Sequence, residues 1–248
     1  MTLSPARRTR RFSHETALRP DADRRRLLAL AGAAALTALA PRALAQPAPD
    51  PGLQAQIDAL YTAWERTNYE MSDQLARGNE SAAAAARAGA LARKYPRRSE
   101  PLVLQAMLLL VEADTKRDMR GLNLAKMAKH LLDEAERIDP NAFGDGSIYT
   151  LQGSLYAAVP GFPLGFGDKG KARRYLRQAL AVNPDGLDPN YFYGDLLYHE
   201  GRYAEAEQVL NHALAAPPRP GKEVADRGRK REASDLLVYV RKKAARKG

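Results

Sequence analysis

Two overlapping glycine patterns are the strongest candidates for chemistry in this sequence. A G-x-G-x-x-G pattern spans 165–170, and a G-x-x-x-x-G-K pattern spans 165–171. In nucleotide-binding proteins such glycines let backbone amides approach a phosphate, but both patterns need a strand in front, and here a proline-rich loop precedes. The second pattern also needs Ser or Thr after the lysine, where this chain has Ala172. We therefore interpret the glycines as turn residues and Asp168 as the N-cap of a helix, and we predict no cofactor.

Other reactive groups are sparse. The chain has no cysteine, which removes disulfides, thiolate zinc sites and a cysteine nucleophile. It has no G-x-S-x-G nucleophile elbow, and its four histidines, two of which are His130 and His199, have no metal-binding spacing. The sequence therefore predicts no catalytic residue, no metal site and no enzyme. The remote alternative is a wall-polymer enzyme, which a cleft with two convergent carboxylates of perturbed pKa would favour.

The first 45 residues have the pattern of an export signal. Arg24–Arg26 precede an apolar run of 14 residues, 27–40, which at about 1.5 Å per residue is too short to span a bilayer. Ala43, Leu44 and Ala45 form the small-x-small pattern that signal peptidase accepts. We predict a periplasmic protein cleaved after Ala45. The Sec and twin-arginine routes both stay open, and an uncleaved, membrane-tethered form is the third possibility.

Four prolines divide the rest of the chain into similar units. Pro96, Pro140, Pro184 and Pro218 each end a helix-like segment, at spacings of 44, 44 and 34 residues. A period of 34 residues is that of the tetratricopeptide repeat, a helical hairpin. We predict an all-α solenoid in which the second and third units carry ten extra residues each. The ten lie between the helices of the second unit, and seven lie between those of the third. The predicted domains are the export signal 1–45, a repeat domain 46–218 with repeats at about 53–98, 99–140, 141–184 and 185–218, and a basic capping helix and tail 219–248.

Individual residues support this register. Gly153 and Gly194 occupy the position in the first helix of a hairpin where a side chain would hold the helices apart. Gly201 fits a left-handed cap, and Asp188 with Pro189 fits an N-cap and the first helical residue. Residues 101–111 are apolar almost all round and predict a buried central helix. A capping helix covers the open end of the last repeat, with one apolar side formed by Ala233, Leu236, Leu237, Val240 and Ala244.

A concave groove is the surface that such an array offers to a partner, because the first helices of successive units line it. Core packing between units is the alternative for the two tyrosines of the last unit. Two phenylalanines of the third unit's insertion must be buried against a neighbouring repeat, another subunit or a ligand. The candidate partner-binding or ligand-binding residues are Thr150, Ser154, Phe162, Phe166, Tyr191, Asp195, Tyr198 and His199.

Three segments carry a family resemblance. The sequences GSLY at 153–156, VPGFPLGFGD at 159–168 and DPNYFYGD at 188–195 resemble the T-component family of tripartite ATP-independent periplasmic (TRAP) transporters. The resemblance extends over about 100–240. It implies an all-helical periplasmic protein that is not an enzyme, associates with the transporter's solute-binding subunit and forms trimers with a pore through each subunit. Family members can be lipoproteins, but this chain has no cysteine to carry a lipid.

The formal net charge of +10 is unevenly distributed. Residues 1–45 contain 9 Arg and 3 acids, and residues 219–248 contain 11 basic residues and 4 acids. The body, 46–218, contains 19 basic and 22 acidic residues. A mildly acidic body does not fit a nucleic-acid partner. We therefore predict a protein partner, no nucleic acid, and membrane contact only through the basic tail.

Overall fold

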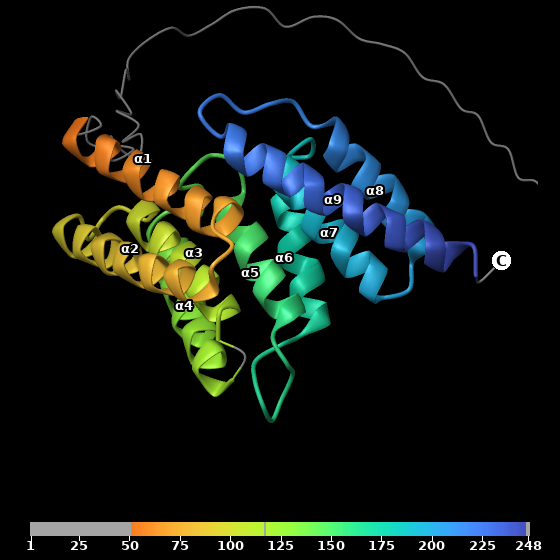
Figure 1. Cartoon of the computed structure of the whole chain (residues 1–248), viewed down its shortest axis with the longest axis horizontal. Helices are drawn as coiled ribbons and strands as arrows, with labels where there is room; N and C mark the ends of the chain where they lie inside the picture. The colour runs from red at the N-terminus through yellow and green to blue at the C-terminus, as the bar shows by residue number, and fades with distance from the viewer. Residues whose placement is uncertain (1–50, 117, 247–248) are drawn as a thin grey trace, which may run out of the picture. The chain divides into compact units, whose positions relative to one another are not determined.

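The computed structural model describes residues 51–116 and 118–246, and every regular element in these two ranges is a helix (Figure 1). This confirms the predicted all-α fold class. The predicted export signal and its cleavage site lie outside the described residues. The helices are α1 (Pro51–Glu65), its π-helical continuation η1 (Arg66–Glu70), α2 (Gln74–Lys94), α3 (Glu100–Asp114), α4 (Met119–Ile138), α5 (Ser147–Ala158), α6 (Lys169–Val182), α7 (Leu187–His199), α8 (Tyr203–Ala215) and α9 (Glu223–Ala244).

Successive helices pack as hairpins, with α3 on α4, α5 on α6 and α7 on α8. The predicted small positions allow this close approach. A Cβ atom on Gly153 would lie 2.5 Å from Cγ of Leu176, and one on Gly194 would lie 2.8 Å from Cγ of Leu210. Gly201 has a φ of 75° in the turn after α7, a conformation that glycine adopts without strain. These features together confirm the tetratricopeptide-like hairpin geometry.

The two longer units accommodate their extra residues differently. In the third unit the loop 159–168 joins α5 to α6, and it is seven residues longer than the turn 200–202 of the last unit, as predicted. In the second unit only 115–118 separate α3 from α4, so nine of the ten extra residues lengthen the two helices instead of forming a loop. The expected second loop is absent because 119–128 is rich in helix-forming residues and Asp118 N-caps α4, whereas prolines and glycines interrupt 160–167.

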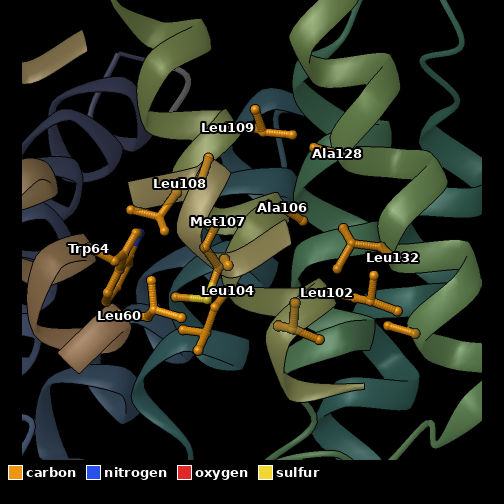
Figure 2. Close-up of a cluster of buried hydrophobic side chains, with 14 of the residues drawn as sticks. Leu60, Trp64, Leu102, Leu104, Ala106, Met107, Leu108, Leu109, Ala128 and Leu132 are labelled. Atoms are coloured by element: carbon orange, nitrogen blue, oxygen red, sulfur yellow. The ribbon is translucent and has the colours of Figure 1, made fainter. Parts of the chain in front are cut away.

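The largest part of the core surrounds α3. Val103, Leu104 and Leu108 are completely buried there, as the nearly all-round apolar pattern predicts. Figure 2 shows Leu60 and Trp64 of α1 on one side of this helix, and residues of α4 on the other. The core therefore fixes α1 relative to the second hairpin.

The last helix does more than cap the last repeat. Its C-terminal half packs on α8, as predicted, through Ala233, Leu237 and Val240. Its N-terminal end reaches the first hairpin, where Oε1 of buried Glu65 accepts a hydrogen bond from the backbone N of Ala225 at 2.9 Å. Figure 1 shows α9 running across α7 toward α8. The closing helix therefore connects the first hairpin to the last.

Candidate binding groove

A groove of about 430 Å³ is lined by α1, α3, α5 and α7, the first helices of the four hairpins, and by α9, with one arginine from α2. A narrower pocket of about 50 Å³ shares five lining residues with it, so the two form one continuous hollow. The shared residues are Trp64, Met107, Leu151, Phe192 and Arg229. The wall that the two share is therefore apolar apart from one cation.

Arg229 of α9 is that cation, and it is 8% exposed. Its guanidinium carbon lies 4.6 Å from the ring centroid of Tyr191 and 4.5 Å from that of Phe192. Its Nε donates to Oδ1 of Asp188 at 2.8 Å, and its Nη1 donates to Oε2 of Glu232 at 2.5 Å. Stacking on two rings and pairing with two carboxylates offset the cost of removing this charge from water.

Asp188 is the residue that joins the two arginines of the closing segment. The expectation that it N-caps α7 is wrong: the N-cap is Gly186, and Asp188 lies in the first turn. Its Oδ2 accepts from Nη1 of Arg219 at 2.8 Å, while its Oδ1 binds Arg229. Burial acts to raise the pKa of Asp188, but the two guanidiniums outweigh it and hold the pKa below its ordinary value. Asp226 completes the group, because its Oδ1 accepts from Nε of Arg219 at 2.7 Å.

Three carboxylates from three different helices line the groove. Asp114 is paired with Arg77, with 2.7 Å between Oδ2 and Nη1. Burial raises the pKa of Asp195, and its Oδ1 lies 3.4 Å from Nε2 of His199. Burial also raises the pKa of Glu232, in spite of its contact with Arg229. The groove is therefore polar at three points and disfavours the ionised form of two of its acids.

Three of the predicted binding residues of the first helices face this hollow. Asp195 and Ser154 line the groove, and Thr150 lines the narrower pocket. Thr150 is 4% exposed, and its Oγ1 donates to the carbonyl of Gly146 at 3.0 Å, so it mainly stabilises α5.

The predicted aromatic residues of α7 have other surroundings. Tyr191 is half-buried against Arg229, and burial raises its pKa to about 12. Tyr198 contacts Tyr203 with ring centroids 5.8 Å apart and does not line the groove. The side chain of His199 is 64% exposed and reaches the groove only through Asp195. Both tyrosines therefore take part in packing between helices.

The two phenylalanines of the loop 159–168 do not line the groove. Phe166 packs edge-to-face on Tyr156 of α5, with ring centroids 5.6 Å apart. Phe162 is 94% exposed. Asp168 N-caps α6 as predicted, because its Oδ1 accepts from the backbone N of Lys171 at 2.9 Å. The glycine patterns therefore belong to a turn and a helix cap.

Sequence reasoning missed Arg219 and Arg229, because both lie in a segment that looks like a solvated basic tail. One signal for Arg229 was available. Ala225, Arg229 and Ala233 are spaced four residues apart, so the arginine lies on the buried side of α9. A cation on the apolar stripe of a helix indicates a buried ion pair.

A match to a family model agrees with the helical-repeat fold. Residues 164–226 match a family model described as tetratricopeptide repeat. The crystal structure of a thermophilic TPR protein from Thermus thermophilus is similar at 21% identity and a TM-score of 0.49, covering 73% of this chain and 92% of that one. No curated protein matches the chain. The family match therefore indicates a tetratricopeptide repeat within residues 164–226, a fold that generally serves protein–protein interaction.

Within 51–116 and 118–246, no group of three or more His, Cys, Asp or Glu side chains could hold a metal ion. Among the helices described, none is long and apolar enough to cross a membrane.

Proposed function

We propose that this chain is a periplasmic helical-repeat protein that binds a segment of a protein partner in its groove. The observation that supports this most is the groove itself. Its volume of about 430 Å³ suits a few side chains of a partner segment, and its apolar walls carry carboxylates at separate points. A partner segment with apolar side chains and one or two cations would match this surface.

The partner that we favour is the solute-binding subunit of a TRAP-type transporter. The motifs at 153–156, 159–168 and 188–195 support this choice, and so does the export signal pattern of 1–45. The same resemblance implies trimers. The alternative is a general scaffold or assembly factor of the cell envelope. Gene neighbourhood distinguishes the two, because transporter genes beside this one favour the first and envelope-biogenesis genes favour the second.

Filling the groove tests the proposal. Ser154 is half-buried on the groove wall, so Ser154→Trp should occupy the hollow and remove a partner from periplasmic pulldowns. Gln178→Trp is the matched control, because Gln178 is exposed on α6 and lies outside the groove. Recovery of the same partner by the Ser154 variant, with both variants folded, would refute binding in the groove.

A wall-polymer enzyme is the second candidate, and one observation favours it. Asp195 and Glu232 line the same groove, and burial raises the pKa of both. Both already face a positively charged or protonatable group, His199 and Arg229, which fits a binding surface equally well. Release of soluble fragments from cell walls that Glu232→Gln abolishes would support the enzyme and overturn a pure binding function.

A further inference from the structure

The tip of the loop 159–168 exposes two large apolar side chains. Phe162 is 94% exposed and Leu164 is 66% exposed. In Figure 1 the loop projects beyond the ends of α5 and α6. Neither side chain lines the groove described above. Their exposure therefore has no role in the core and no role in the groove.

The loop is held in place at its base, so the exposure does not come from a loose segment. The backbone N of Gly167 donates to the carbonyl of Pro160 at 2.9 Å, and that of Asp168 donates to the carbonyl of Tyr156 at 2.9 Å. A Cβ atom on Gly167 would overlap the carbonyl oxygen of Val159, so only glycine allows this close crossing. Phe166 packs against Tyr156 and anchors the loop to α5. The fold thus presents the tip on a fixed support.

Helix α6, which begins directly after the loop, has only one sign of charge. Its sequence contains five cations and no acid. Arg173 is paired with Glu200, with 2.5 Å between Nη2 and Oε1. The other four have exposed side chains, and within the described residues none has a carboxylate within ion-pairing distance. They are Lys169, Lys171, Arg174 and Arg177.

We propose that the loop tip and α6 form a membrane-contact surface that binds an anionic lipid bilayer. Phe162 and Leu164 would enter the interface between headgroups and acyl chains, and the α6 cations would lie among the anionic headgroups. A bilayer suits the protruding tip better than a protein surface does, because a fluid lipid interface can take up apolar side chains without a pocket of matching shape. Four unpaired cations on one helix likewise suit a dense layer of phosphates. This surface is additional to the basic tail, which the sequence alone indicated for membrane contact.

Vesicle flotation tests the proposal on the protein recovered from its own cells, which carries its natural N-terminus. The vesicles are pure phosphatidylcholine, or phosphatidylcholine with about one third phosphatidylglycerol. We expect binding to the anionic vesicles that weakens with salt. Phe162→Ser with Leu164→Ser should lower the partition coefficient about tenfold. Changing any one of the four unpaired cations of α6 to Gln should lower the partition coefficient about fivefold.

The control changes exposed apolar residues elsewhere. Val238 and Tyr239 on α9 are 65% and 60% exposed, so Val238→Ser with Tyr239→Ser removes similar surface from a different face. This control should bind vesicles like the unchanged protein, and circular dichroism should show all variants folded. Equal binding by the loop variant, or an equal loss in the α9 control, would overturn the proposal. The proposal would also be overturned if the unchanged protein failed to bind anionic vesicles and the loop variant lost a protein partner. That result would make the tip a protein-docking site. The groove variant Ser154→Trp should keep vesicle binding, so the two proposals fail independently.

Discussion

Two aspartates on α7 provide the sharpest test of how the closing helix is held. Asp188 binds both Arg219 and Arg229, and its pKa lies below the ordinary value, whereas burial raises the pKa of Asp195. Replacing Asp188 with Asn removes the shared partner of two largely buried guanidiniums. Breaking a buried ion pair costs about 3–5 kcal/mol in general, and since each arginine keeps a second carboxylate we expect about 2–3 kcal/mol here. Asp195→Asn should change stability by less than about 1 kcal/mol at neutral pH, because ionised Asp195 is itself disfavoured.

Urea and thermal unfolding at several pH values measure this difference. For a domain of this size we expect Asp188→Asn to lower Tm by roughly 5–10 °C at pH 7. A carboxylate with a lowered folded pKa contributes stability that is present above its unfolded pKa and lost as the pH falls through the folded value. The gap between the unchanged protein and Asp188→Asn should therefore be constant above about pH 5 and shrink below about pH 4. Equal effects of the two Asn variants, or a gap that persists in acid, would refute the ion-pair account.

Three further changes probe the helical framework. Gly153→Ala should destabilise the chain by about 1–3 kcal/mol in urea unfolding, because its Cβ would press on a buried leucine of α6. The control Gly170→Ala, in the exposed first turn of α6, should be neutral or stabilising. Asp168→Ala should lower the free energy of unfolding by about 1 kcal/mol, because α6 loses its N-cap. An unchanged midpoint of urea unfolding would contradict that role. Glu65→Ala should accelerate amide hydrogen exchange in the first turn of α9, because a buried backbone N–H loses its acceptor, while Glu65→Gln should preserve protection.

The helical framework could be predicted because its signals are local. Gly153, Gly194 and Gly201 lie where a hairpin requires a small residue or a left-handed turn, and sequence spacing alone reveals such positions. The buried helix at 101–111 could be predicted for the same reason. The sequence also has one helical apolar pattern that runs from Leu53 through Trp64 to Leu75, but Leu75 is 69% exposed because the helix breaks between η1 and α2. A periodic pattern does not reveal such a break when polar residues fill it.

The polar centre of the groove could not be predicted because its partners are distant in sequence. Asp188 and Arg229 are 41 residues apart, and Glu65 and Ala225 are 160 apart. An aspartate followed by a proline is a common N-cap signal, and only the position of α9 shows that this carboxylate has another partner. The expected positions of Asp195 and Ser154 on the groove wall follow from the face of a first helix. The two arginines that were missed lie just before α9 and within it, and this helix returns to the groove from the end of the array.

The position of α9 also changes how the charge of the chain is understood. Segment counts assign the positive surface to 219–248, with 11 basic residues and 4 acids. Yet Arg219 and Arg229 of that segment are paired with Asp188, Asp226 and Glu232, so they contribute little to the outer field. The body is acidic in sum, yet α6 within it presents four cations that have no ion-pair partner among the described residues. Net charge by segment therefore locates neither surface, because an ion pair such as Arg229 with Asp188 cancels in the field while its two members are counted in different segments. Both positive regions lie beside exposed apolar side chains, Phe162 and Leu164 next to α6 and Val238 and Tyr239 on α9, so the vesicle binding of the loop and α9 variants decides which of the two contacts the membrane.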